Sequence, residues 1–258
     1  MSSSSPSPVR LRPAIGDAIG TTAFFRNRIL FDTLLDQIAA SGLKEVSVLF
    51  HACSIGAEVY SLVVQYLVRQ LDQQFSLHCY ATDKQPGFVD FARAASFPSE
   101  IIKGCSAEEM PFFVVSDGVV KPADSVLARI EFLPASAFDA FTTARIFDVV
   151  CLLNCLLYVP AATQSSVLAA VSSYNKRWLV TTGFHQETIK PDLQANGYSP
   201  ILTNLEQIHN GWTDRLRAEP IPAGQLPPHI FTDWSLQPFV KNVDFEYKLC
   251  ALFNKRTD

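Results

Sequence analysis

Three short segments of the sequence combine small residues with a side chain that could bind or orient a ligand. The first is residues 51–58, HACSIGAE, where small residues would let a ligand approach the backbone and Glu58 stands where a helix is predicted to begin. The second ends in Asp83, placed where nucleoside-binding folds use an acid to accept hydrogen bonds from two ribose hydroxyls. The third carries Asn154 and Tyr158, which follow an apolar run.

Each of these side chains also has an ordinary structural alternative. Glu58 by itself would favour the positive end of its helix. Asp83 and Asn154 could cap helices, and Tyr158 could simply pack against its neighbours. The segments therefore indicate a binding site only if the fold brings them to one place.

The elements around these segments follow a repeated order of strand, loop and helix. Short apolar runs predict strands at 46–52, 77–81, 130–133, 147–153 and 178–182, and apolar residues at helical spacing predict helices at 21–39, 59–71, 88–95 and 163–174. This alternation indicates a doubly wound, Rossmann-like α/β fold with helices on both faces of a parallel sheet. Ligands of such sheets sit beyond the carboxyl ends of the strands, so the three segments are expected to face one crevice.

One principal domain, residues 13–258, is predicted to follow a disordered, Ser- and Pro-rich tail at residues 1–12. The N-terminal helix of the domain is assigned to residues 13–42. Residues 97–129 are predicted to form a small inserted β-subdomain, because two extended pieces there are joined by Ser-Asp-Gly, a good hairpin signal.

The C-terminal third contains two further strand-like runs, residues 198–208 and 245–253. They are predicted to close the sheet as an antiparallel pair, separated by a Pro-rich connection at 220–238. Structural packing is the expected role of the remaining aromatic and histidine residues of this part, His209, Trp212, His229 and Trp234.

Composition excludes several other classes of protein. The 258 residues are 48% hydrophobic and 18% charged, as in a well-buried globular chain, and the net charge of -4 disfavours a nucleic-acid binder. The apolar runs are too short to span a membrane, and the polar N-terminus does not resemble a signal peptide, so a cytoplasmic location is expected. Six cysteines without paired spacing are expected to be reduced core residues and to hold no metal: Cys53, Cys79, Cys105, Cys151, Cys155 and Cys250.

Four segments, in this order, resemble motifs of the CheR-type glutamate O-methyltransferases of bacterial chemotaxis. TTAFFRN (21–27) resembles T-x-F-F-R, and ACSIGAEVYSL (52–62) resembles A-C-S-T-G-E-E-P-Y-S-L. YATDKQPGFVDFARAASFP (80–98) is similar to A-T-D-I-x-x-x-x-L-x-x-A-R-x-x-x-Y-P, and FDVVCLLNCLLYVPAATQSSVL (147–168) is similar to F-D-L-I-F-C-R-N-V-L-I-Y-F-x-x-x-x-Q-x-x-I-L. The resemblance implies a class I methyltransferase fold that uses S-adenosylmethionine and releases S-adenosylhomocysteine.

The resemblance also implies roles for individual residues. Arg26 and Tyr158 match the Arg and Tyr next to the transferred methyl group and the acceptor carboxylate. The positions implied to bind the cofactor are Thr22, Ala52, Cys53, Ser54, Gly56, Glu58, Asp83, Ser136, Ala137, Asn154 and Cys155. A carboxylate acceptor suits this set, because it is ionised at neutral pH and an Arg can orient it through two parallel hydrogen bonds. Without the motif, a surface ion pair would be the expected role of Arg26.

Several positions depart from the family pattern. Leu153 replaces an Arg, Ala57 a Glu, Val59 a Pro, and Ser136 an Asn. About 20 residues precede the T-x-F-F-R element, so we expect the N-terminal helical domain used in receptor methylation to be missing or much reduced.

The expected acceptor is therefore a small molecule or a peptide rather than a chemoreceptor. Two alternatives stay open: methylation of a nitrogen, carbon or hydroxyl group with His51 or His185 as the general base, or a degenerate member that binds the cofactor without turnover. A dehydrogenase is less favoured, because no G-x-G-x-x-G follows the first strand.

Overall fold

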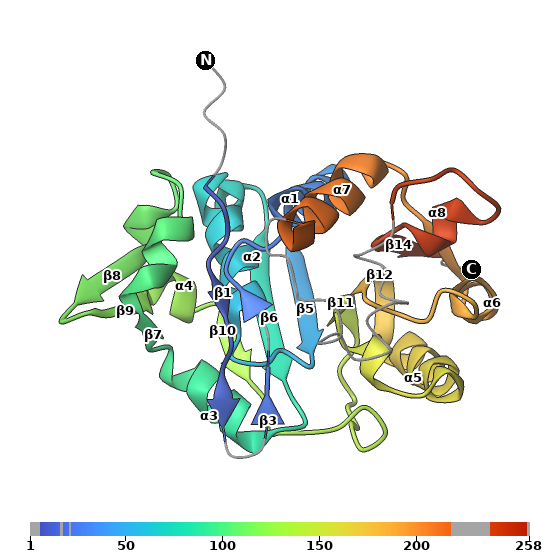
Figure 1. The fold of residues 1–258 in the computed structure, drawn as a ribbon, viewed down its shortest axis with the longest axis horizontal. Helices are drawn as coiled ribbons and strands as arrows, with labels where there is room; N and C mark the ends of the chain where they lie inside the picture. Colours follow the sequence, from blue (N-terminus) through green and yellow to red (C-terminus); the bar gives the residue numbers. More distant parts are fainter. Residues whose placement is uncertain (1–5, 16–17, 21, 218–237, 257–258) are drawn as a thin grey trace. The chain divides into compact units, whose positions relative to one another are not determined.

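Three parallel strands form the sheet of the first of two units, Met1–Ala137 (Figure 1). β6 (Ser76–Thr82) lies between β5 (Glu45–His51) and β10 (Ile130–Phe132), and both neighbours run parallel to it. These strands correspond to the apolar runs predicted at 46–52, 77–81 and 130–133, and each of their ends differs from the prediction by at most one residue. The computed structural model describes residues 6–15, 18–20, 22–217 and 238–256.

Helices connect these strands as predicted. α1 (Arg28–Ala40) packs on α2 (Ala57–Val68), α2 contacts β6, and α3 (Pro86–Ala94) contacts β10. A 3-10 turn, η1 (Leu71–Gln73), follows α2. α3 begins with a proline, whose fixed backbone angle suits the first turn of a helix.

The first helix begins later than predicted. The sequence pattern predicted a helix over 21–39, but α1 begins at Arg28, because the Asn27 side chain caps it by accepting a hydrogen bond from the Leu30 N–H at 3.1 Å. Phe25 has a left-handed backbone (φ 53°), which a helix cannot contain. The apolar residues before Arg28 are buried by tertiary packing, so their spacing mimicked a helical turn.

Short strands precede α1. β1 (Arg10–Leu11) pairs antiparallel with β4 (Thr22–Ala23), and β2 (Ala14–Ile15) pairs with β3 (Ala18–Ile19). The end of the predicted 1–12 tail is thus a paired strand, while residues 1–5 lie outside the described residues.

The inserted β-subdomain contains the predicted hairpin. Its strands are β7 (Phe97–Pro98), β8 (Phe113–Ser116) and β9 (Val119–Pro122), with β9 in the centre, and its helical turns are η2 (Ser99–Gly104), η3 (Met110–Phe112) and α4 (Asp124–Leu127). Asp117 and Gly118, which join β8 to β9, both have positive φ angles (51° and 76°). Two such residues are what a tight hairpin turn of matching twist requires.

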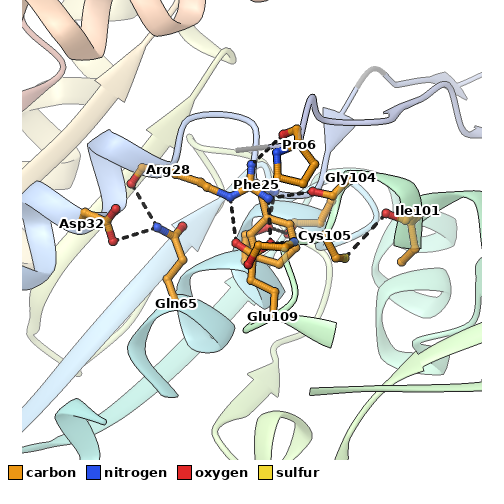
Figure 2. A network of polar contacts seen from close by, with 12 residues as sticks. Pro6, Phe25, Arg28, Asp32, Gln65, Ile101, Gly104, Cys105 and Glu109 are labelled. Carbon is orange, nitrogen blue, oxygen red and sulfur yellow. Dashed lines mark hydrogen bonds and ion pairs between the residues drawn. The ribbon is translucent and has the colours of Figure 1, made fainter. Parts of the chain in front are cut away.

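A buried ion pair joins this subdomain to the start of α1 (Figure 2). Arg28 Nε and Nη2 donate to the two carboxylate oxygens of Glu109 at 2.8 and 2.7 Å, and Nη2 also donates to the Gly104 carbonyl at 2.6 Å. The Glu109 carboxylate accepts a further hydrogen bond from the Ser106 N–H at 2.7 Å. The guanidinium carbon lies 4.7 Å from the centre of the Phe25 ring. Segments distant in the sequence are therefore fixed to one another around a single arginine.

The second unit, Phe138–Asp258, has four strands of mixed direction. β11 (Phe147–Leu153) and β12 (Asn175–Thr182) are parallel, β14 (Leu252–Lys255) runs antiparallel to β12, and β13 (Tyr198–Pro200) runs antiparallel to β14. Its helices are η4 (Leu156–Tyr158), α5 (Ala161–Tyr174), α6 (Ile189–Ala195), α7 (Leu205–Arg217) and α8 (Phe245–Lys248). The antiparallel pair β13–β14 was predicted.

Two of the strands predicted in this part were too long. The runs 198–208 and 245–253 were predicted as continuous strands, but each is part strand and part helix. In α7, Leu205, Ile208 and His209 are buried, which is the spacing of one helical face rather than of a strand. Of the Pro-rich connection at 220–238, all but the last residue lies outside the described residues, as do His229 and Trp234.

Together the elements make the predicted Rossmann-like α/β fold with an inserted hairpin and an antiparallel C-terminal pair. All six cysteines are buried and unbridged, which confirms their assignment to the core. Among the described residues, no helix is long and apolar enough to cross a membrane.

The Arg28–Glu109 pair gives a test of this architecture. Replacing Glu109 by Gln leaves a buried guanidinium without its counter-charge, so we expect the free energy of unfolding to fall by about 2–3 kcal/mol. Asp90→Asn is the matched control, because the Asp90–Arg93 pair is 72% and 52% exposed and should change stability by less than about 0.5 kcal/mol. Urea denaturation followed by circular dichroism measures both. Equal effects of the two variants would contradict the role assigned to Glu109.

Candidate functional site

The loop between β5 and α2 is held in an unusual backbone conformation. Ala52, Ser54 and Gly56 all have positive φ angles, of 62°, 51° and 81°. For residues other than glycine this costs about 1–3 kcal/mol each and persists only where the surroundings impose it. The Cys53 N–H donates to the Thr82 carbonyl and the Gly56 N–H to the Cys53 carbonyl, both at 2.9 Å, and so fixes the loop.

Gly56 also meets a spatial constraint. A Cβ atom at this position would lie 3.1–3.4 Å from side-chain atoms of Tyr60, Ala92 and Phe132. Its left-handed backbone and its tight surroundings together require glycine. The sequence predicted that Gly56 binds the cofactor, but not that its surroundings leave no room for a side chain.

Asp83 connects the ends of two neighbouring strands. Its Oδ2 accepts a hydrogen bond from the Ser54 N–H at 2.8 Å, and its Oδ1 accepts one from the Gln85 N–H at 3.0 Å. The structural alternative of a cap is therefore partly correct, since the second bond stabilises the turn into α3. An ionised carboxylate has about four acceptor sites, so these two bonds leave capacity for a ligand's hydroxyl groups.

Thr22, Arg26 and Glu58 meet at the start of α2. Arg26 Nη1 lies 3.2 Å from Glu58 Oε1, and the Thr22 hydroxyl donates to Glu58 Oε2. The Arg26 and Glu58 side chains are 9% and 12% exposed. The pair is therefore not the exposed surface ion pair that would be expected without the motif.

A row of polar side chains on α2 positions the segment that carries Arg26. Ser61 Oγ accepts a hydrogen bond from the Phe25 N–H at 2.8 Å, and Gln65 Nε2 donates to the Arg28 carbonyl at 3.0 Å (Figure 2). With Glu58, these residues have the spacing of one helical face. The sequence analysis missed Ser61 and Gln65, although polar residues at that spacing within an apolar helix were a usable signal.

Ser136 and Ala137 follow β10. The Ser136 N–H donates to the Asp83 carbonyl at 2.9 Å, so this segment runs beside the end of β6. The Ser136 hydroxyl is directed to the Ala137 carbonyl, at 3.1 Å. Both residues are partly exposed. Their predicted role in binding the cofactor stays a prediction.

In the second unit, Asn154 is held at the end of β11 by the neighbouring strand. Its N–H donates to the Thr182 carbonyl at 2.8 Å, and the Thr182 hydroxyl donates to its Oδ1 at 3.2 Å. Asn154 has φ 51°. Gly183 (φ 64°) packs directly on it, because a Cβ there would lie 3.0 Å from Asn154 Cα and 2.4 Å from Leu157 Cδ2.

Cys155 and Tyr158 belong to the turn after Asn154. Cys155 is buried, whereas Tyr158, the last residue of η4, is 65% exposed. The predicted site residues thus form two groups, one in each unit. Those of the second unit follow β11, whereas those of the first come from the segments after β5, β6 and β10, from the start of α2 and from the segment before α1.

The two histidines considered as general bases differ in their surroundings. His51 is 2% exposed, and burial lowers the pKa of its imidazole to about 4, which makes it a weak base. The side chain of His185 is 17% exposed, and its Nε2 lies 2.6 Å from the Val159 carbonyl oxygen. Among the described residues, no cluster of His, Cys, Asp and Glu has the arrangement of a metal site.

The positions that depart from the family pattern lie in apolar surroundings. Ala57 and Val59 are fully buried in the first turn of α2, and Leu153 is half-buried at the end of β11. A carboxylate at position 57 would be costly to desolvate there.

The first unit suits a nucleoside that carries charged groups. The strained, small-residue loop brings backbone within reach of a ligand, Asp83 can accept from hydroxyl groups, and Glu58 offers a negative charge. In addition, Ser54 Oγ is buried and makes no hydrogen bond with the described residues. These features fit S-adenosylmethionine, and with the Rossmann-like fold they define a class I methyltransferase domain.

The chain belongs to the CheR methyltransferase family. Residues 20–192 match the family model "CheR methyltransferase, SAM binding domain", and this domain binds S-adenosylmethionine as its cofactor. No match was found among the curated proteins.

Solved structures with a similar fold include two methyltransferases. Magnesium protoporphyrin IX methyltransferase (ChlM) from Synechocystis PCC 6803 with bound SAM is 17% identical, with a TM-score of 0.40 over 67% of this chain and 72% of that chain. N-methyltransferase NodS from Bradyrhizobium japonicum WM9 in complex with S-adenosyl-L-homocysteine is 15% identical, with a TM-score of 0.40 over 69% of this chain and 78% of that chain. The family assignment rests on the matched sequence rather than on these structures.

The buried His51 predicts a pH dependence of stability. Its pKa is about 4 in the folded chain and 6.5 in the unfolded chain, so between these values the unfolded chain binds the extra proton. The stabilising contribution is complete above pH 6.5 and is lost as the pH falls towards 4. We expect His51→Gln to remove roughly 2–3 kcal/mol of this pH dependence in urea denaturation between pH 7.5 and 4.5.

His78→Gln is the control for this measurement, because His78 is exposed on β6. Its replacement should leave the slope of stability against pH unchanged. A slope for His51→Gln as steep as in the wild type would contradict the assignment.

Gly183 and Gly197 form a matched pair for testing the packing around Asn154. Both have left-handed backbones, with φ angles of 64° and 77°, but a Cβ at Gly197 would have no neighbour within 4 Å. Gly197→Ala should cost about 1 kcal/mol from backbone strain alone, whereas Gly183→Ala should cost about 3 kcal/mol because Leu157 and Asn154 must also move. Thermal and urea denaturation measure the difference. Similar losses in both variants would show that Asn154 is not tightly packed against Gly183.

Proposed function

We propose that this protein transfers a methyl group from S-adenosylmethionine to a carboxylate oxygen of a small molecule or a peptide. The observation that carries this proposal is the largely buried cluster in which Glu58 binds both Thr22 and Arg26. It places a guanidinium next to Glu58, which the motif resemblance implies to bind the cofactor. A cation at that position can attract and orient an anionic acceptor.

The chemistry of a carboxylate acceptor agrees with the residues present. S-adenosylmethionine supplies an electrophilic methyl group when bound. A carboxylate is already ionised at neutral pH, so the protein need not remove a proton and has mainly to orient the acceptor. Arg26 is the proposed orienting residue, because a guanidinium carries five N–H donors and can bridge two carboxylates.

Glu58, Asp83 and Ser54 are the residues proposed to hold the cofactor in the first unit. The Glu58 carboxylate would balance positive charge on the cofactor, and Asp83 would accept hydrogen bonds from its ribose. Asn154 and Tyr158 of the second unit are proposed to take the roles that the family motif gives them. The side chain of Tyr158 is 65% exposed and can therefore be reached by a ligand.

Methylation of a less acidic acceptor would require a base. Burial makes His51 a weak base, and Nε2 of His185 already donates to a backbone carbonyl. These surroundings support a carboxylate over a nitrogen, carbon or hydroxyl acceptor.

The proposal is tested by labelled methyl transfer. The protein is incubated with S-adenosylmethionine carrying a tritiated methyl group and with a pool of carboxylate-bearing peptides and metabolites, and the products are then treated with alkali. Carboxyl methyl esters release volatile methanol under alkali, whereas methyl groups on nitrogen, carbon or ether oxygen do not. We expect volatile label from the wild type and at least a tenfold loss of transfer in Arg26→Gln, because the acceptor is then misplaced.

Asp90→Asn serves as the control, with transfer expected to equal that of the wild type. Isothermal titration with S-adenosylmethionine shows whether Arg26→Gln still binds the cofactor. Alkali-stable label would assign a different acceptor atom. Failure of the folded wild type to bind S-adenosylmethionine would defeat the proposal altogether, while tight binding without any transfer would indicate a degenerate member.

A further inference from the structure

A fully buried glutamine organises the second unit next to Tyr158. Gln164 of α5 belongs to the family motif but has no role in the function proposed above. Its Oε1 accepts a hydrogen bond from the His185 N–H at 2.8 Å, and its Nε2 donates to Thr188 Oγ1 at 2.9 Å and to Asp192 Oδ2 at 3.1 Å. Both ends of the amide are therefore used, and the segment after β12 is fixed to α5 and α6.

His185, which Gln164 holds, extends this connection to the turn that carries Tyr158. Its Nε2 lies 2.6 Å from the carbonyl oxygen of Val159. A carbonyl oxygen can only accept a hydrogen bond, so Nε2 must carry the proton and donate it. Val159 directly follows Tyr158, and the bond fixes the peptide group between Val159 and Pro160, one residue beyond Tyr158.

The other side of Tyr158 is fixed by the same segment. The Leu157 N–H donates to the Gly183 carbonyl at 2.9 Å. Tyr158 thus lies between two hydrogen bonds to residues 183–185. Tyr158 is 65% exposed, so burial contributes little to fixing it, and these two bonds hold the backbone before and after it.

We propose that His185 is a positioning residue for Tyr158, with Gln164 holding His185 in place. The proposal rests on the proposed function, in which Tyr158 contacts the reacting groups. His185 acts in it as a hydrogen-bond donor through Nε2 and accepts no proton from the acceptor. Its imidazole Nδ1 lies 3.7 Å from Glu187 Oε1, and this exposed carboxylate is not required for the donation to Val159.

The experiment compares a variant that keeps the donor with one that removes it. His185→Gln retains an N–H group at about the reach of Nε2, whereas His185→Leu has similar bulk and no donor. The reporter is 3-fluorotyrosine incorporated at position 158 and observed by ¹⁹F NMR, which requires neither cofactor nor acceptor. We expect the wild-type chemical shift and line width in His185→Gln, and a shifted or broadened signal in His185→Leu.

Two further variants separate positioning from general stability. Gln164→Leu should alter the Tyr158 signal as His185→Leu does, and it keeps the test available if His185→Leu does not fold. Glu187→Gln is the control and should leave the signal unchanged. An unaltered Tyr158 signal in His185→Leu or in Gln164→Leu, with a lowered melting temperature, would show that the network is merely structural and would overturn the proposal.

Methyl transfer then completes the test. We expect kcat to fall at least tenfold in His185→Leu and less than threefold in His185→Gln, with the Kd for S-adenosylmethionine unchanged in both. A His185→Gln variant with a normal Tyr158 signal but no transfer would assign His185 as a general base and overturn the positioning role. If the wild type shows no transfer, the proposed function fails, while the NMR result still decides whether His185 fixes Tyr158.

Discussion

The Glu58 carboxylate is the interaction on which the first half of the site depends. It binds Thr22 and Arg26, two residues that lie before the sheet in the sequence, and it stands in the first turn of the helix that follows the strained loop. Ser61 and Gln65 continue the same helical face and hold the intervening backbone. The helix α2 therefore follows directly on the strained loop and also positions the segment that carries Arg26.

Several residues with left-handed backbones lie in the segments predicted to form the site. Phe25, Ala52, Ser54 and Asn154 all have positive φ angles, which side-chain-bearing residues seldom adopt. Hydrogen bonds to other elements hold them in place. For example, the Phe25 N–H donates to the Ser61 hydroxyl, and the Asn154 N–H donates to the Thr182 carbonyl. The surrounding structure stabilises conformations that are locally unfavourable, as is common where a protein must present atoms to a ligand.

The two units use different polar contacts to hold their segments together. In the first, buried carboxylates accept hydrogen bonds from backbone and side chains, as at Asp83 and Glu109. In the second, a neutral amide, Gln164, connects three segments, and it donates to the partly buried Asp192 carboxylate. Positions 57 and 153, where the family pattern has charged residues, carry apolar ones in this chain.

The strands, the hairpin and the family of this protein could be predicted from local patterns in the sequence alone. Continuous apolar runs gave the strands, Asp-Gly gave the hairpin, and four collinear motifs gave the methyltransferase family, because each depends on neighbouring residues. The helices α7 and α8 and the contacts made by Ser61, Gln65 and His185 were decided only by the tertiary structure. Their hydrogen bonds and packing join residues tens of positions apart, and no local spacing records which distant partner a polar side chain will meet.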